Sequence, residues 1–354
     1  RGRRSGRTRD RKRMEVSDEE SVTGPARTPD TDSEPEQPDP AAAPAAIAPY
    51  PGDIDDETEA DLARLLDSSE QPDPAALRAG MEPYLGDIDR YMRSLEASRR
   101  PRDDYIWTTQ EDINPKMRAV LVDWLVDVSC TFRLPADTLH LAVSYVDRFL
   151  TASVIKWREL QLLGVTALLV AAKYEDDIFV HEVQRYRGVT ANTYTTKHVV
   201  KMETDILKSL NFEMGSPTAR TFLRRYITVC RGRDRAKAKK LEFLCSYLAE
   251  LSLLDYDCIQ FNPSVVAAAC LFLARFTISP TARPWNLTLQ RNTKYKVSDL
   301  KSCILMIHKL QLNGYPGLKE DAIKVKYNDR ELEHVSAMDP PENIPLRFLK
   351  DIGQ

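Results

Sequence analysis

The longest apolar stretch lies in the middle of the chain and predicts a buried helix. Between Leu162 and Ala172 a single residue carries a polar side chain, and a helix that is apolar on every face is buried on every face. The stretch is too short to span a bilayer. Gly164, Ala167 and Ala171 give it one face with little bulk, where we expect a neighbouring helix to approach closely. The charged residues 173–177 follow at once, and we expect them to meet a partner protein at the surface.

Apolar residues recur at helical spacing on either side of this stretch. Before it, the pattern predicts an amphipathic helix around 88–95, a helix that begins with the Asn-Pro cap at 114–115, and a third that opens at Pro135. After it, a short helix is expected within 177–192 and a longer one over 196–212. The inward face of this last helix should consist of Val199, Val200, Met202, Ile206, Leu207 and Leu210.

A second series of apolar stripes follows and repeats the arrangement. It predicts helices near 222–227, 241–251, 263–276, 297–312 and 317–328, and the third of these contains three consecutive alanines. Each half is therefore a helical unit of about 100 residues whose third helix is rich in small residues, which indicates a structural duplication. Strand signals are nearly absent, so the predicted fold class is all-α.

Composition and pattern together divide the chain into five parts. We expect a disordered regulatory arm at 1–80, a helix and linker at 81–113, a first helical unit at 114–214, a second at 215–313, and a final helix with a tail at 314–354. The arm is rich in Pro, Ala, Asp and Glu, and such a segment cannot bury enough apolar area to offset the entropy lost on ordering.

Two features of the arm suggest regulation. Residues 1–13 hold eight Arg or Lys and one Asp, which predicts a nuclear import signal and hence a nuclear protein, with the cytoplasm as the alternative location. A simple solvated basic tail is the other interpretation of this run. Thr28 precedes Pro29 and forms a minimal site for proline-directed phosphorylation.

Composition excludes several classes of function. The net charge of −3 gives no general attraction to nucleic acid or anionic membrane, and the sequence has no run of 18 apolar residues and no secretory signal. The six cysteines form no CxxC pair, so we expect reduced thiols packed as small hydrophobic groups in an intracellular protein, and no zinc. No phosphate-binding loop and no catalytic constellation is visible. We therefore expect a non-catalytic binding module without cofactor or metal.

Three long segments resemble the cyclin box, and the similarity extends over about residues 84–348. They read MRAVLVDWLVDV at 117–128, LHLAVSYVDRFL at 139–150, and LQLLGVTALLVAAKYE at 160–175. The first segment is typical of mitotic-type cyclins. FLARF at 272–276 and the LLDY string at 253–256 resemble the A-type branch of plants. The resemblance implies two tandem five-helix cyclin boxes, preceded by an N-terminal helix.

The resemblance also implies a function and a site. Cyclins are non-catalytic activators of cyclin-dependent kinases, and they dock on the kinase helix that carries an active-site glutamate. A Lys–Glu pair of the family falls on Lys173 and Glu203 here. Further positions that match kinase contacts are Ile88, Tyr91, Val170, Tyr174, Glu175, Leu207 and Phe212. Without the resemblance, a simple intramolecular ion pair surrounded by core residues would be the better interpretation.

A second site implied by the family is a shallow apolar groove that recruits substrates and kinase inhibitors bearing an Arg-x-Leu motif. Its residues here are Met117, Val120, Leu121, Trp124, Asp127 and Gln161. The same stripe has the spacing of an ordinary core face, which is the alternative interpretation. Asp127 stands where the family usually has glutamate, so the carboxylate is one methylene shorter.

Other departures from the family leave two rival functions open. The segment YEDDIFVHEV at 174–183 has an extra acidic residue and lacks the usual prolines, which is compatible with a paralogue that binds a kinase without activating it. Residues 1–80 contain no destruction box and no Lys-Glu-Asn box.

A cyclin-fold transcription factor would need a zinc ribbon and a basic surface, and neither is apparent. The expected partners are a kinase and Arg-x-Leu proteins, without nucleic acid or membrane.

Overall fold

The computed structural model describes residues 84–175, 181–230, 235–318 and 321–352. Four sequence predictions lie outside these residues: the disordered arm, the basic run at 1–13, Thr28, and the altered acidic loop from 176 to 180. Within the described residues the secondary structure is helical throughout, as the apolar periodicity predicts. None of the described helices is both long enough and apolar enough to cross a membrane.

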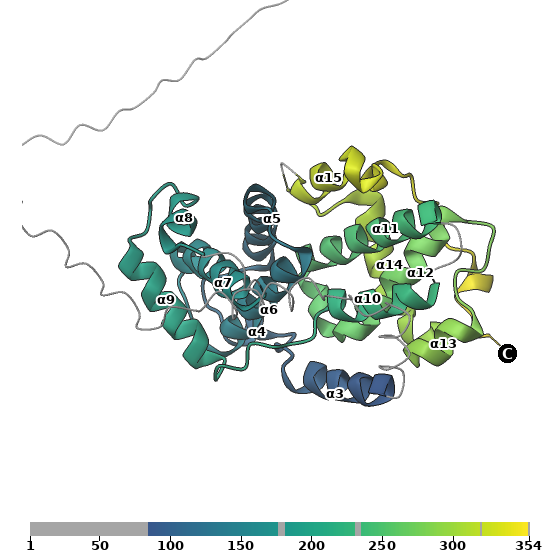
Figure 1. Cartoon of the computed structure of the whole chain (residues 1–354), viewed down its shortest axis with the longest axis horizontal. Helices are drawn as coiled ribbons and strands as arrows, with labels where there is room; N and C mark the ends of the chain where they lie inside the picture. Colours follow the sequence, from purple (N-terminus) through teal and green to yellow (C-terminus); the bar gives the residue numbers. More distant parts are fainter. Residues whose placement is uncertain (1–83, 176–180, 231–234, 319–320, 353–354) are drawn as a thin grey trace, which may run out of the picture. The chain divides into compact units, whose positions relative to one another are not determined.

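The first box consists of five helices arranged around α7 (Figure 1). They are α5 (Pro115–Phe132), α6 (Ala136–Ala152), α7 (Leu160–Glu175), α8 (Val183–Gly188) and α9 (Thr196–Ser209). Helix α7 packs against the other four, and every residue from Leu162 to Ala172 is buried. A Cβ atom added to Gly164 would lie 2.7 Å from Leu121 Cδ1, so the close approach of α5 and α7 requires glycine there.

The second box repeats this plan. Its helices are α10 (Ala219–Cys230), α11 (Arg235–Leu254), α12 (Pro263–Ile278), α13 (Leu287–Thr293) and α14 (Val297–Asn313). The alanine-rich α12 is the central helix here and packs against α10, α11 and α14. The expected duplication is therefore confirmed, with α7 and α12 as corresponding central helices. The seven-residue α13 was not foreseen, because two turns give too few apolar positions to establish a period.

The remaining elements flank the two boxes. Helix α3 (Leu85–Ser98) contacts α12, so the N-terminal helix packs on the second box although it precedes the first in sequence (Figure 1). A short α4 (Tyr105–Thr108) contacts α6, the 3-10 turn η3 (Tyr256–Gln260) follows α11, and α15 (Ala322–Tyr327) lies against α5 and α11.

A buried ion pair of the first box also contacts the second box. The Arg118 guanidinium donates to both carboxylate oxygens of Asp147, from Nε at 2.7 Å and from Nη2 at 2.8 Å, and its Nη1 donates to the carbonyl oxygen of Leu253 at 2.7 Å. Arg118 belongs to α5, Asp147 to α6, and Leu253 to α11 of the second box. Because the groups of a buried bidentate pair must all be satisfied, the Leu253 carbonyl group of the second box completes the hydrogen bonding of Arg118.

Three local predictions were wrong. Val200 was expected to face inward but is 46% exposed, because adjacent helix positions lie 100° apart and Val199 already takes the buried place. Helix α9 ends at Ser209 rather than at residue 212, since Asn211 and Phe212 adopt left-handed backbone angles. Cys130 is exposed, whereas Cys245, Cys258, Cys270 and Cys303 are buried as expected.

Candidate partner-binding site

Lys173 and Glu203 form an ion pair between two helices of the first box. Lys173 Nζ lies 2.7 Å from Glu203 Oε1, with 40% of the lysine side chain and 18% of the glutamate side chain exposed. Buried neighbours fix both ends: Ala172 precedes the lysine on α7, and Met202 precedes the glutamate on α9. A lysine in the last turn of α7 is also favoured by the helix dipole. The pair is thus held rigidly and remains accessible to a partner.

Exposed aromatic side chains are among the other predicted kinase contacts. Tyr91, Tyr174 and Phe212 are all more than half exposed, and Phe212 keeps a left-handed backbone angle (φ 58°) that is unfavourable for a bulky residue. Large apolar groups of this kind usually anchor protein interfaces. Glu175 is exposed as well, and burial of part of its carboxylate together with the charge of Asp137 raises its pKa.

Other residues of the predicted kinase site are less accessible. Ile88 and Leu207 are half-buried, and Val170 is only 4% exposed. Val170 therefore supports α7 from within the core and offers no surface to a partner in this conformation. The more exposed residues of the predicted site lie on separate elements: on α3, which packs on α12, at the end of α7, and in the turn after α9.

Arg99 ties α3 to the first box, and the sequence pattern did not identify it as a site residue. Its Nη1 donates to the carbonyl oxygen of Gly215, and its Nε lies 3.2 Å from Glu213 Oε2. A Cβ atom on Gly215 would lie 2.6 Å from the Tyr174 hydroxyl oxygen, so this glycine makes room for the tyrosine. The only signal for Arg99 was its place at the end of an amphipathic helix, which does not distinguish it from a solvated cap.

The predicted docking groove lies on α5. Val120 is 50% exposed, Asp127 is exposed, and Met117, Trp124 and Gln161 are half-buried. Gln161 lies one turn before Gly164 on α7, on the face that packs against α5. Leu121 differs from the others, because it is 5% exposed and fills the space over Gly164. It is therefore a core residue beneath the stripe rather than part of its surface.

The described residues contain no group of three or more His, Cys, Asp or Glu side chains that could hold a metal ion. The strongly shifted pKa values of cysteine and histidine belong to buried groups, of which Cys258, Cys270 and Cys303 lie near one another in the second box. Burial raises the pKa of the Cys303 thiol, and burial lowers the pKa of His140 and His308. The described residues around α7 and α9 offer an accessible ion pair, with the exposed Tyr174 directly after Lys173.

Comparison with known proteins identifies the family. The sequence model of the cyclin N-terminal domain matches residues 87–215, and that of the cyclin C-terminal domain matches residues 217–341. The chain therefore belongs to the cyclin family. Within that family its similar relatives include A-type cyclins of plants, in agreement with the branch expected from the sequence. Cyclin-A3-2 of Oryza sativa subsp. japonica is 50% identical over 266 residues, which cover 75% of this chain and 69% of the relative.

Two further relatives and one solved structure complete the comparison. Putative cyclin-A3-1 of Arabidopsis thaliana is 48% identical over 74% of each chain. The G2/mitotic-specific cyclin C13-1 of Daucus carota is 48% identical over 73% of this chain and 75% of its own. A viral cyclin from herpesvirus saimiri has the same fold, with a TM-score of 0.56 and 18% identity over 63% of this chain and 97% of the viral one.

Proposed function

We propose that this cyclin binds a cyclin-dependent kinase through the surface around Lys173 and Glu203 and activates it. The observation that carries the proposal is the accessible ion pair between α7 and α9, 2.7 Å long, at the positions where the family has its kinase-binding pair. The Daucus carota relative is named a G2/mitotic-specific cyclin, which supports a role in the mitotic cell cycle. The chain itself acts as a regulatory subunit and not as the enzyme.

The proposed binding follows from the chemistry of this surface. Both members of the pair retain hydrogen-bonding capacity, since a lysine ammonium has three donors and a carboxylate several acceptor positions. Exposed Tyr91, Tyr174 and Phe212 supply apolar area that docking removes from water. As in the family, docking on this rigid surface would move the kinase helix that carries the active-site glutamate toward the kinase active site.

The test is reconstitution with a purified plant cyclin-dependent kinase and histone H1. The wild-type chain should stimulate phosphorylation and bind the kinase, and Lys173→Ala should lose both. Truncation of one partner of an interfacial charge pair costs about 2–5 kcal/mol, or roughly 30- to several thousand-fold in Kd. Lys301→Ala, which removes an exposed lysine from α14, is the matched control and should behave as wild type.

Two results would count against the proposal. A folded chain that neither binds nor stimulates any member of a panel of such kinases would contradict it. A chain that captures a kinase without stimulating histone phosphorylation would instead identify a non-activating cyclin.

We further propose that the α5 stripe recruits substrates and inhibitors that carry an Arg-x-Leu motif. Exposed Val120 and half-buried Met117 and Trp124 supply apolar contacts, and the Asp127 carboxylate faces the basic residue of the peptide. Trp124→Ala should weaken binding of a fluorescent Arg-x-Leu peptide more than tenfold and leave kinase binding intact. Val325→Ala removes a 74% exposed apolar side chain from α15, outside the stripe, and should change neither peptide binding nor kinase binding.

A further inference from the structure

A polar pocket of about 200 Å³ lies where the C-terminal ends of α3, α6 and α9 meet. Three arginines line it, Arg99, Arg100 and Arg148, and Glu213 is the one acidic residue among the described residues of its wall. The charge of the lining is therefore positive, which favours an anion.

The segment 213–216 holds two of the guanidinium groups in place. Arg99 Nη1 donates to the carbonyl oxygen of Gly215, and Arg99 Nε lies 3.2 Å from Glu213 Oε2. Arg148 Nη1 donates to the carbonyl oxygen of Glu213 and to the hydroxyl oxygen of Ser216, both at 3.0 Å. Since both arginines are bound to the same four residues, their guanidinium groups lie close together without help from a ligand.

Both of these arginines have N–H groups left over. Nε and Nη2 of Arg148 and Nη2 of Arg99 have no hydrogen-bond or ion-pair partner among the described residues. None of the three is one of the buried polar atoms without a partner, so solvent reaches them. Asn211, also in the wall, is exposed and adds an amide that can donate. A ligand in the pocket can thus accept hydrogen bonds from three side chains.

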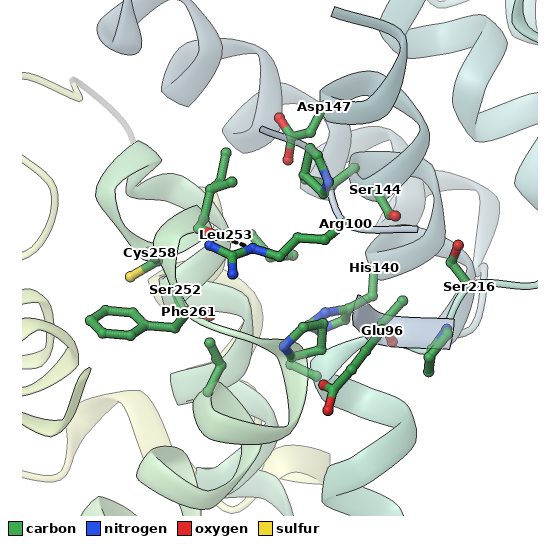
Figure 2. Close-up of a pocket in the computed structure, with 18 of the residues that line it drawn as sticks. Glu96, Arg100, His140, Ser144, Asp147, Ser216, Ser252, Leu253, Cys258 and Phe261 are labelled. Atoms are coloured by element: carbon green, nitrogen blue, oxygen red, sulfur yellow. Dashed lines mark hydrogen bonds between the residues drawn. The ribbon is translucent and has the colours of Figure 1, made fainter. Parts of the chain in front are cut away.

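Arg100 contributes charge but no free guanidinium nitrogen. Its three nitrogens donate to the carbonyl oxygens of Ile259 and Gln260 and to the side chain of Asn262. It also lines the neighbouring cavity between the boxes, which Figure 2 shows. The donors available to a ligand are therefore those of the other two arginines and of Asn211.

The positive charges of the pocket oppose one another. Burial lowers the pKa of Arg148, and the charge of Arg99 lowers it further, while the Glu213 carboxylate acts in the opposite direction. A second anion bound between the two guanidinium groups removes this repulsion.

The donors suit a phosphate monoester better than other anions. Such a group carries nearly two negative charges at neutral pH and has three terminal oxygens, whereas a carboxylate has one charge and two oxygens. Nucleotides are disfavoured, because a base requires an apolar or aromatic wall and the described lining has only Pro101 and Leu210. A phosphorylated side chain supplies the same anion without a base.

We propose that this pocket binds the phosphoryl group of a phosphorylated serine or threonine side chain on a protein partner, with Arg99, Arg148 and Asn211 as hydrogen-bond donors. Phe212, which lies between Asn211 and Glu213 and is 66% exposed, is one of the predicted kinase contacts, so a protein bound there reaches the edge of the pocket. The proposal rests on the proposed function only for the arrival of such a protein. Affinity for the phosphoryl group is a property of this chain alone.

The test titrates the full chain, without kinase, into N-acetyl-phosphothreonine N-methylamide at pH 7.5 and follows binding by phosphorus NMR. Arg99→Gln and Arg148→Gln should each weaken binding about tenfold or more, the factor expected for a hydrogen bond to a charged group. Asn211→Gly, which suits the left-handed backbone at this position, should weaken it severalfold. Glu213→Gln should tighten it, because a repelling carboxylate is removed. Arg291→Gln, at an exposed arginine of α13, is the matched control and should bind as wild type does.

Two competitors examine the selectivity of the pocket. Inorganic phosphate should displace the phosphothreonine derivative, and the corresponding aspartate derivative should do so only at far higher concentration. Equal competition by the aspartate derivative would overturn the preference for a phosphoryl group. Binding of inorganic phosphate without binding of the phosphothreonine derivative would exclude a phosphorylated side chain as the ligand.

The variants decide the location. Undiminished affinity of Arg148→Gln and Asn211→Gly, or weaker binding to Glu213→Gln, would show that the anion binds elsewhere, and no binding at millimolar concentration would exclude the site. Thermal unfolding followed by circular dichroism identifies variants that do not fold. If Arg148→Gln is among them, the substitutions at the exposed positions 211 and 213 still decide. Because no kinase is present, none of these results depends on whether the chain activates one.

Discussion

Glu96 of α3 caps the N-terminus of α12. Its Oε2 accepts a hydrogen bond from the backbone N–H of Ser264 at 2.9 Å, and its Oε1 accepts from the Ser264 hydroxyl at 2.7 Å. The local N-cap residue, Asn262, makes no side-chain bond to the helix. A carboxylate 168 positions away in sequence thus supplies the cap of the central helix of the second box. It also anchors the helix that carries Ile88 and Tyr91.

The burial of Glu96 leads to a prediction about pH. Burial raises the pKa of this carboxyl group above 4.5, against the lowering effect of the Ser264 hydrogen bonds. An acid whose pKa is raised on folding contributes stability that is present below its unfolded pKa and is lost as pH rises through its folded pKa. The free energy of unfolding of wild type, relative to Glu96→Gln, should therefore fall between pH 4 and pH 7.

Urea unfolding at intervals of pH measures this difference, and other titrating groups cancel because both chains contain them. Glu111→Gln, at an exposed position, is the control and should show no such trend. A relative stability of wild type that increases with pH would show that the ionised carboxylate is the favoured form in the folded chain.

His140 should make the fold sensitive to acid. Its pKa is lowered from 6.5 to about 3, because burial, helped by the charges of Arg220 and Lys326, disfavours the protonated ring. A base with a lowered pKa contributes stability above its unfolded pKa, and this stability is lost as pH falls toward the folded value. Between pH 7 and pH 5 the wild type should lose about 2 kcal/mol relative to His140→Leu.

Chemical unfolding at the two pH values checks this expectation. His334→Leu is the control, since His334 lies in a different part of the fold, at the cap of a short 3-10 turn. If the free energies of unfolding of wild type and His140→Leu changed in parallel between the two pH values, the His140 ring would be protonated in the folded chain at pH 5.

The sequence was sufficient for the long helices but not for the short α13 or for the long-range contacts between helices. The apolar period located both central helices, and the Asn-Pro cap at 114–115 marked the start of α5 to the residue. The resemblance paired Lys173 with Glu203 across 30 positions. By contrast, the Glu96 cap and the Arg99 contact with Gly215 depend on where α3 packs, and no local pattern encodes that. Leu121 and Val170, which the resemblance placed in binding surfaces, are buried, and their burial depends on how the helices pack.

Close packing of α5 on α7 predicts that Gly164→Ala destabilises the chain. The added methyl group would lie 2.7 Å from Leu121 Cδ1, and Leu121 is too deeply buried to move freely. Overpacking of this kind costs about 1–3 kcal/mol. Leu121→Val in the same chain should restore part of the lost free energy of unfolding. A double-mutant cycle followed by urea unfolding measures this coupling. If the two substitutions changed the free energy of unfolding additively, the two side chains would not be in contact. Gly86→Ala on α3 serves as the control, because no atom lies near its Cβ position.

The last prediction separates two roles of the Lys173–Glu203 pair. Because the lysine side chain is 40% exposed, the pair should add less than about 1 kcal/mol to stability, and Lys173→Ala should unfold nearly as wild type does. Its loss of kinase binding should then be far larger than its loss of stability. The exchanged pair Lys173→Glu with Glu203→Lys restores the ion pair within the chain but inverts the charges that a partner meets. We expect it to unfold as wild type does in thermal melts, yet to remain unable to bind the kinase in a titration. Kinase binding restored by the exchange would mean that the pair acts only by holding α7 against α9, and that the partner does not contact its charges.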